Sequence, residues 1–400
     1  MSTTITRTTR IGSLRLVEAR GRKPISLCIA LSDAYRQGVF APSAVEQTNN
    51  CAPYTAEPDE EVAAGYEGQL FTELFGSMLI CAHTVKWKPQ VKAFINDGAK
   101  RIHSLTTELV DGTYRSRPPK LMTVYYPKKR QVSCITYRDR IYQRWLCDNY
   151  IYANMTKSFI WANCSCQKGK GNDVARDLLK KYLWRHYTHY GNEGYALQID
   201  IHSYYQSIPL NQTLALFKRK LAPRVYKHVE EILRVQYGSE GFYAGSQLIQ
   251  ILGVSYLDGL DHYIKEKLCI KGYIRYQDDF ILIHPDKAYL EHCLNEITLR
   301  LHALGLELNA KKTHIKPLSG NISWLGFIYT LQKGGKIYMR VSPKRFKEMR
   351  RKLRKHPQSL PSYITYIGKG GHSYKLIQRL IEEFGNENIQ CRNDKDAERS

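Results

Sequence analysis

The most informative stretch of this chain is Lys-Gly-Tyr-Ile-Arg-Tyr-Gln-Asp-Asp-Phe-Ile-Leu-Ile-His, residues 271–284. Two adjacent acids, Asp278 and Asp279, separate two short runs rich in the Tyr, Ile and Phe that favour strands. The pattern predicts a tight β-hairpin with both carboxylates at or beside its tip. Such a pair suits Mg²⁺, which takes oxygen ligands in near-octahedral geometry and recruits substrate phosphates. The alternative is an ordinary turn, because turns favour Asp.

A second acid of the same kind lies 78 positions upstream of Asp278. Residues 195–201, Tyr-Ala-Leu-Gln-Ile-Asp-Ile, read as a short apolar strand that carries Asp200 at its end. Two-metal phosphoryl transfer uses cations about 4 Å apart, held by acids from distant parts of a chain. Asp200 is the obvious second contributor, although a helix-capping Asp is the alternative for this acid taken alone.

The net charge of the chain indicates which kind of partner it attracts. The 400 residues include 60 Lys and Arg against 37 Asp and Glu, and the net charge is +23. A surface of this kind attracts polyanions, of which nucleic acid is the commonest large one, while a merely soluble basic protein is the alternative. The hydrophobic fraction of 43% is that of a globular chain, and 400 residues can hold two or three domains.

Neither the cysteines nor the termini indicate an extracellular or membrane protein. Ten cysteines without paired metal-ligand spacing read as reduced thiols, because Cys164 and Cys166 are too close for an ordinary zinc pair. The N-terminus lacks the apolar core of a signal peptide, and no run approaches the length of a membrane span. We therefore expect a cytoplasmic protein with no membrane partner.

The order of expected elements mixes helices with antiparallel hairpins, so the fold class is α+β. An acidic, Pro-containing stretch at 48–68 reads as a loop or linker. Helical spacing predicts helices over 69–83, 91–110, 139–155, 172–188, 210–236, 247–268 and 288–304. Strand patterns predict a hairpin with a basic tip over 121–138, the strand 195–201, the hairpin 272–284, and short strands near 306–309 and 323–330.

Several motifs in order resemble those of reverse transcriptases. Residues 200–208 resemble the first catalytic motif of that family, and residues 275–280 resemble its Tyr-x-Asp-Asp motif. The remaining similar segments are the fingers segments 127–130 and 138–143, the Gly-Lys-Gly element 167–172, the glycine loop and helix 241–263, the segment 304–313 and the primer grip 324–327. The resemblance covers residues 120–330.

The resemblance implies an RNA-directed DNA polymerase with a right-hand fold: fingers, a palm with an antiparallel sheet, and a helical thumb. It implies an N-terminal extension over 1–90, a fingers and palm core over 91–335, and a basic helical thumb and tail over 336–400. Asp200, Asp278 and Asp279 would be the catalytic acids. Together with the backbone carbonyl of Ile201 they would hold two Mg²⁺ ions, for which Mn²⁺ can substitute.

The nucleotide-binding residues follow from the same resemblance, and each has a plainer alternative. The basic tip, Lys128, Lys129 and Arg130, would meet the triphosphate, since charge-assisted donors suit phosphate oxygens; a solvated turn is the alternative. Tyr205 would exclude the nucleotide 2′-hydroxyl, or else be a core tyrosine beside Tyr204.

Three further residues complete the predicted nucleotide site. Gly245 would let the backbone approach the nucleotide, and Gln250 would face the template; ordinary loop and helix surface is the alternative for both. Lys312 would neutralise the leaving pyrophosphate, or be an exposed helix-end lysine.

Nucleic-acid contacts are implied in three further places. Trp324, Leu325, Gly326 and Phe327 match the primer grip. The basic tail over 338–356 would place cations along a helix against duplex phosphates, with generic basic surface as the alternative. The expected nucleic-acid-binding residues are Lys168, Lys170, Lys344, Arg345, Arg350, Arg351 and Arg354.

Departures from related groups narrow the kind of enzyme. Ser203 and Tyr243 stand where the polymerases of diversity-generating retroelements carry lysine and proline. We expect no maturation, RNase H or endonuclease domain after the thumb. The chain resembles a prokaryotic polymerase near that group, many of whose members act in antiphage defence. We expect it to copy a dedicated noncoding RNA into DNA from dNTPs, with a protein partner or a second copy of the chain as further options.

Two alternatives stay open at this level. One is the polymerase of a diversity-generating retroelement, which makes mutagenised cDNA. The other is a catalytically silent RNA-binding scaffold. The sequence does not identify the template or the primer, which could even be a hydroxyl-bearing side chain.

Overall fold

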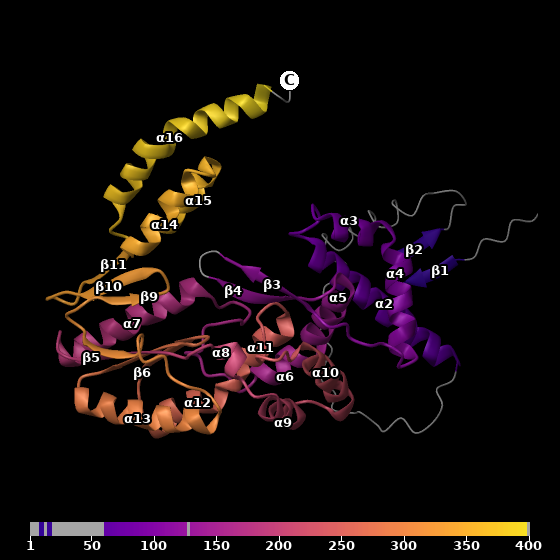
Figure 1. Ribbon diagram of the computed structural model, residues 1–400, viewed down its shortest axis with the longest axis horizontal. Helices are drawn as coiled ribbons and strands as arrows, with labels where there is room; N and C mark the ends of the chain where they lie inside the picture. Colours follow the sequence, from indigo (N-terminus) through magenta and orange to yellow (C-terminus); the bar gives the residue numbers. More distant parts are fainter. Residues whose placement is uncertain (1–7, 12–13, 18–59, 126–128, 398–400) are drawn as a thin grey trace, which may run out of the picture. The chain divides into compact units, whose positions relative to one another are not determined.

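A computed structural model describes the backbone of residues 8–11, 14–17, 60–125 and 129–397, and the side chains of residues 66–125 and 129–385 (Figure 1). The chain divides into two compact units. Unit 1 comprises Met1–Met122 and Cys134–Asn149, and unit 2 comprises Thr123–Ser133 and Tyr150–Ser400. The predicted three-part division, with boundaries at 90 and 335, stays a prediction.

Unit 1 is mainly helical. Its helices are α2 (Glu60–Ala82), α3 (Pro89–Asn96), α4 (Gly98–Val110) and α5 (Tyr137–Leu146), and β1 (Thr8–Ile11) pairs antiparallel with β2 (Leu14–Val17). Helix α2 packs against α4 and α5 through fully buried apolar side chains, among them Leu74, Met78, Ile102 and Leu105.

Two expectations for unit 1 differ from the structure. Helix α2 begins at Glu60, inside the stretch expected to be a linker. The helix expected over 91–110 is broken at Asp97, whose φ of −106° and ψ of 22° leave the helical range. Gly98, which starts the next helix, lies so close to Met78 that an added Cβ would be 3.1 Å from that side chain, so the break brings two helices together.

The predicted hairpin with a basic tip is present. Strands β3 (Lys120–Val124) and β4 (Arg130–Cys134) form a two-stranded sheet. Lys128, at the tip, lies outside the described residues. In unit 2, the Ser133 backbone N–H of β4 donates to the carbonyl of Ala244 at 3.0 Å, which joins the hairpin to the glycine loop.

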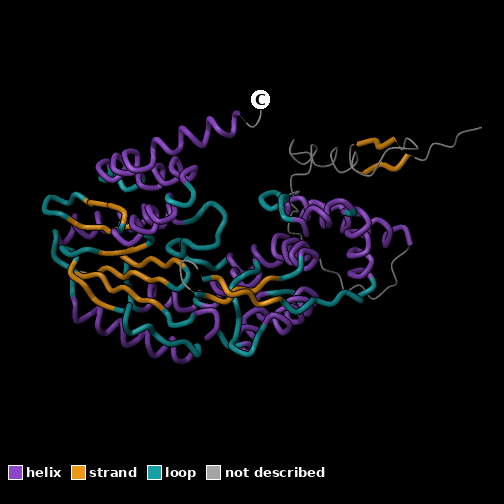
Figure 2. Tube along the Cα trace, turned by 45° about the horizontal axis from the view of Figure 1, so that its top comes forward, coloured by secondary structure: helices purple, strands orange, loops and turns teal. Residues whose placement is uncertain are grey.

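The central sheet of unit 2 confirms the predicted antiparallel arrangement. Its strand order is β6 (Gly272–Tyr276), β7 (Asp279–His284), β5 (Tyr195–Asp200) and β8 (His314–Pro317), and every neighbouring pair is antiparallel. Figure 2 shows the strands in orange. Helix α7 (Asn172–Tyr190) packs on one face, and α13 (Lys287–Ala303) packs on the other (Figure 1). The sheet register places Asp200 opposite Asp279.

Further helices surround this sheet or follow it along the chain. They are the π-helix η1 (Cys147–Ile151), α6 (Tyr152–Thr156), α8 (Tyr204–Ser207), α9 (Leu210–Lys220), α10 (Pro223–Gln236), α11 (Gln247–Tyr256), α12 (Asp258–His262), the π-helix η2 (Tyr263–Lys267), α14 (Pro343–Leu353), the 3₁₀-helix η3 (Pro357–Ser359), α15 (Leu360–Gly368) and α16 (Tyr374–Ala397). No helix in the described part of the chain has both the length and the apolar character that crossing a membrane requires.

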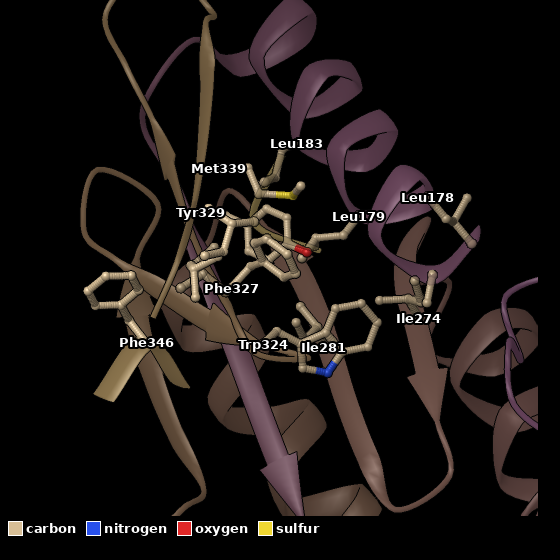
Figure 3. Packing of buried hydrophobic residues seen from close by; sticks show 14 of the residues in the cluster. Leu178, Leu179, Leu183, Ile274, Ile281, Trp324, Phe327, Tyr329, Met339 and Phe346 are labelled. Carbon is tan, nitrogen blue, oxygen red and sulfur yellow. The ribbon is translucent and has the colours of Figure 1, made fainter. Parts of the chain in front are cut away.

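A second sheet shares its hydrophobic core with the C-terminal helices. Strands β9 (Ile322–Trp324), β10 (Phe327–Leu331) and β11 (Ile337–Val341) are antiparallel, in the order β11-β10-β9. Their buried side chains pack with those of α7 and α14. Figure 3 shows Phe327 and Tyr329 between Leu179, Leu183 and Met339.

The expected elements of unit 2 are present with local corrections. The helix expected over 210–236 ends at Lys220 and restarts at Pro223, which has no N–H to continue a helix but suits the first turn of one. Residues 306–309 are not a strand, since Leu308 forms only an isolated bridge to Ile201. The strand expected over 323–330 is two strands, β9 and β10, separated by Leu325 and Gly326, whose φ angles are 46° and 84°.

Candidate active site

The site is built on the tip of the β6–β7 hairpin. Tyr276 and Asp279 are paired across it, so Gln277 and Asp278 form a two-residue loop. Asp278 and Asp279 are half-buried, and Asp200, at the end of the adjacent strand β5, is 8% exposed. The sheet therefore brings the adjacent acids Asp278 and Asp279 together with Asp200, which is distant from them in sequence.

Burial and neighbouring acids disfavour the charged forms of Asp278 and Asp279. Burial and, after it, the neighbouring Asp278 and Asp200 together raise the pKa of Asp279 to about 7. The pKa of Asp278 is raised as well, first by burial and then by Asp200, while Lys312 and Arg130 oppose the shift. Carboxylates placed so close together favour a cation that can neutralise them.

Two polar side chains meet Asp200 from the segment that follows α13. Lys312 Nζ donates to Asp200 Oδ1 at 2.6 Å, and Asn309 Nδ2 donates to Asp200 Oδ2 at 3.0 Å. Sequence reasoning included Lys312 but missed Asn309, although Asn309 lies within the motif segment 304–313 that pointed to Lys312.

The donor set of the three acids fits a hard divalent cation. It consists of carboxylate oxygens, the ligand type that Mg²⁺ prefers. Ile201 and Leu308 form an isolated antiparallel bridge. Its two hydrogen bonds run from Asn309 N–H to the carbonyl of Asp200 and from His202 N–H to the carbonyl of Glu307. The carbonyl of Ile201 takes part in neither bond. Among the described residues, no group of three or more His, Cys, Asp or Glu side chains already has a metal-holding arrangement, and Lys312 occupies one oxygen of Asp200. A cation at Asp200 would therefore compete with Lys312 for that oxygen or use one of the other acceptor sites of the carboxylate.

The pKa of Asp279 predicts how pH affects the metal-free protein. Between its ordinary value of 3.8 and about 7, the folded protein holds a proton that the unfolded chain has lost. Stability must then fall as pH rises through this window. We expect Mg²⁺ to raise Tm more at pH 8 than at pH 5, when Tm is measured with Mg²⁺ and with EDTA at each pH. Asp279→Asn should reduce the difference, and an equal Mg²⁺ effect at both pH values would contradict the expectation.

The two tyrosines that follow Ser203 have different surroundings. Tyr204 is buried, and its hydroxyl donates to the carbonyl of Gly253. Tyr205 is half-buried; a Cβ on Gly253 would lie 2.6 Å from its ring, so the ring packs against α11. Burial raises the pKa of Tyr205, and Asp278 contributes to that rise, which places the ring near the acids. Tyr204 is therefore the core tyrosine, and Tyr205 borders the site.

The remaining predicted nucleotide contacts lie on different surfaces. Lys129 and Arg130 are exposed, and the charge of Arg130 reaches Asp278. Gln250 is exposed on α11. Packing alone accounts for glycine at position 245, since an added Cβ would lie 1.9 Å from the carbonyl oxygen of Ser133 in β4.

The predicted primer grip is partly core. Trp324 and Phe327 are buried in the hydrophobic cluster, as Figure 3 shows, while Leu325 and Gly326 form the turn between β9 and β10. The ring of Tyr366 closely approaches this turn, because a Cβ on Gly326 would lie 2.5 Å from its hydroxyl oxygen.

Several of the predicted nucleic-acid-binding cations have partners within the chain. Lys170 donates to the carbonyls of Trp161 and Asn163, each at 3.0 Å, whereas Lys168 is exposed. On α14, Arg350 forms a two-pronged pair with Glu383, and Arg345 pairs with Glu348.

One face of α14 keeps its cations exposed. Phe346, Met349 and Leu353 bury the opposite face. The exposed cations of the helix and the residues just after it are Lys344, Lys347, Arg351, Arg354 and Lys355. Sequence reasoning missed Lys347 and Lys355 as site residues, although the helical spacing of the exposed face includes them.

Comparison with known proteins agrees with this geometry. Residues 120–329, just over half of the chain, match the family of reverse transcriptases (RNA-dependent DNA polymerases). The match supports the predicted α+β right-hand polymerase fold. No curated protein matches the chain.

Solved structures with a similar fold include telomerases. One is telomerase from Candida albicans in complex with a fragment of telomeric RNA, at 11% identity and a TM-score of 0.43, covering 57% of this chain and 46% of that chain. Another is telomerase from Candida tropicalis in complex with such a fragment, at 12% identity and a TM-score of 0.42, covering 74% and 59%. The chain thus spans less than two thirds of the length of either telomerase.

Proposed function

Because this chain belongs to the reverse transcriptase family, we propose that it is an RNA-directed DNA polymerase that extends a 3′-hydroxyl with deoxynucleotides on an RNA template. The observation that carries the proposal is the meeting of Asp200, Asp278 and Asp279 on adjacent antiparallel strands. The raised pKa values of Asp278 and Asp279 support a cation-binding site, because burial and neighbouring acids disfavour the charged forms of these two carboxyl groups.

The acids and Lys312 are proposed to have different roles in nucleotidyl transfer. Asp200, Asp278, Asp279 and the carbonyl of Ile201 would hold two divalent cations, Mg²⁺ or Mn²⁺, which lower the charge barrier between the attacking oxygen and the triphosphate. Lys312 is held at Asp200 by a 2.6 Å bond, so a cation that takes this oxygen leaves its ammonium free for phosphate.

Positive side chains supply the remaining contacts to nucleotide and duplex. Lys129 and Arg130 are exposed donors suited to the triphosphate, with Lys128 predicted beside them. The exposed face of α14 offers a row of cations to the phosphates of the template–primer duplex. Gly245 and Gln250 are proposed to border nucleotide and template, and the turn at Leu325 and Gly326 to contact the primer.

The function is tested with the full chain and an RNA template annealed to a DNA primer. With Mg²⁺ and dNTPs, we expect primer extension into a product that resists alkali and is degraded by DNase. Absence of extension with Mg²⁺ and with Mn²⁺, in a protein that still binds the RNA, would favour the catalytically silent RNA-binding scaffold.

Tyr205 is proposed to exclude ribonucleotides. Its ring packs against Gly253 at the border of the site, so removal of the ring opens space beside the acids. Tyr205→Ala should raise the ratio of rNTP to dNTP incorporation by about ten- to a hundred-fold, the range expected for one steric contact. Tyr205→Phe keeps the ring and should keep the preference. Competition between labelled dNTP and rNTP measures both, and an unaltered ratio in Tyr205→Ala would remove the assignment.

The finer proposal concerns template and role. The motif departures at Ser203 and Tyr243 support a prokaryotic enzyme that copies a dedicated noncoding RNA in antiphage defence, in the cytoplasm and with a protein partner or second copy as options. Sequencing of RNA and DNA that copurify with the protein tests the template. A template repeat and a variable target gene in the flanking DNA would instead favour a diversity-generating retroelement.

A further inference from the structure

The loop that carries the catalytic acids has a strained first residue. Gln277 has a φ of 57°, a left-handed conformation that residues other than Gly, Asn and Asp rarely adopt. A positive φ at the first position of a two-residue hairpin loop usually selects glycine. Strain of this kind persists only where the surroundings hold it, and it gathers at functional sites. The surroundings of Gln277 therefore matter.

A loop from the chain before α7 lies along the edge of β6. This segment, residues 157–171 and called the brace loop below, forms a parallel bridge between Asn163 and Arg275. Arg275 N–H donates to the carbonyl of Ala162, and Cys164 N–H donates to that of Arg275, each at 3.0 Å. The brace loop is thus fixed to the strand that leads into the catalytic hairpin.

Ser165 of the brace loop is bonded to the strained residue. Gln277 N–H donates to Ser165 Oγ at 3.0 Å, and the hydroxyl donates in turn to Asn163 Oδ1 at 3.4 Å. Ser165 and Asn163 are both fully buried, so no water competes for these groups. The hydroxyl therefore presents its acceptor side to Gln277.

Two other polar groups of Gln277, its backbone carbonyl and its side-chain Nε2, are bonded as well. Arg275 Nη1 donates to the Gln277 carbonyl at 3.0 Å, and Gln277 Nε2 donates to Cys166 Sγ at 3.3 Å. Arg275 is itself held by the buried carboxylate of Asp261. The peptide groups on both sides of the strained Cα are therefore anchored, one to the brace loop and the other to a buried ion pair.

We propose that Ser165 is a positioning residue for the catalytic acids: by accepting the Gln277 N–H, it holds the hairpin loop in the strained conformation that sets Asp278 and Asp279 toward Asp200. This inference rests on the proposed function. The direction of the acids follows from the Gln277 backbone, because Asp278 is the next residue and Asp279 pairs with Tyr276 directly after it. A loop freed from Ser165 relaxes toward negative φ and turns the acids away from Asp200.

The test is a double-mutant cycle between Ser165 and Gln277, measured on the full chain with primed RNA. Ser165→Ala should lower kcat for dNTP incorporation about ten-fold, the rate equivalent of one buried hydrogen bond, with little change in KM for dNTP. It should also weaken binding of Mn²⁺, followed by electron paramagnetic resonance, by about three- to ten-fold. Gln277→Gly relieves the strain, so in that background Ser165→Ala should lower kcat less than about three-fold.

The outcomes separate positioning from packing. Ser255→Ala is the matched control, because Ser255 is equally buried and its hydroxyl has no hydrogen-bond partner among the described residues. A Ser165→Ala protein with unchanged kcat and Mn²⁺ affinity, or with the same loss in both backgrounds, overturns the proposal. If Ser165→Ala does not fold, Ser165→Cys, whose thiol is a weak acceptor, enters the same cycle, where coupling to Gln277→Gly supports the proposal and additivity overturns it.

The cycle also distinguishes this inference from the proposed function. Unmodified protein that extends no primer on RNA contradicts the function, while its Mn²⁺ titration with and without Ser165→Ala still tests the positioning. Active unmodified protein with an indifferent Ser165 contradicts the positioning alone.

Discussion

Replacement of Asp278 and Asp279 by Asn is expected to lower nucleotide incorporation by about a thousand-fold or more, since two of the three carboxylates that would hold the cations are lost. Asn keeps the size of the side chain but not its charge. Because burial and mutual repulsion raise the pKa of both acids, the variant should be as stable as the unmodified protein or more so in the absence of metal. Loss of activity would then not reflect loss of fold.

Three measurements on this variant separate catalysis from binding. Primer extension should be absent, the affinity for RNA should be unchanged, and Tm in EDTA should be equal or higher. Asp177→Asn is the control, because Asp177 is an exposed acid on α7 that pairs with Lys180. Mg²⁺-dependent synthesis by the double variant would remove Asp278 and Asp279 from the active site.

Arg275→Met is expected to have the largest effect on stability. Arg275 and Asp261 are both fully buried and ion-paired, and Tyr273 also donates to the Asp261 carboxylate at 2.5 Å. Loss of the guanidinium leaves a buried carboxylate without its counter-charge, which typically lowers the free energy of unfolding by about 3–5 kcal/mol. The same substitution releases the Gln277 carbonyl, so activity should fall with stability.

Urea unfolding of three proteins checks this prediction. The unmodified chain and Arg275→Met give the cost of the unpaired acid. The double variant Arg275→Met/Asp261→Asn removes the buried charge and should recover part of the lost stability. Equal free energies of unfolding for the first two proteins would show that the pair is not structurally important.

The β6–β7 hairpin could be predicted from the local alternation of residue types alone. Residues 271–284 predicted two strands around an acidic tip, and the structure has β6 and β7 with Gln277 and Asp278 as the loop. Alternation of apolar residues and the sharp change at the two acids are local properties, so they can be read without a partner strand. The same holds for Asp200 at the end of its strand.

Breaks within helical stretches were less predictable. The stretch 210–236 is uniformly amphipathic, yet Pro223 divides it into α9 and α10. At Asp97 no proline marks the break, which accompanies the close approach of Gly98 to Met78 of another helix. Strand β8 escaped notice because its four residues, His314–Pro317, carry little apolar pattern and owe their conformation to pairing with β5.

Residue types and the resemblance of the ordered motifs predict the chemistry, namely three acids that would hold divalent cations in a strongly basic chain. The groups that contact these acids could be identified from the tertiary structure alone. Asn309 and Lys312 contact Asp200, and Ser165 contacts Gln277, from segments far apart in the chain, while Asp261 contacts Arg275 from helix α12. The hydrophobic periodicity of the sequence does not predict such contacts, because each contact depends on how sheet, helix and loop pack together. The division of neighbours into core and site, as for Tyr204 and Tyr205, depends on that packing too.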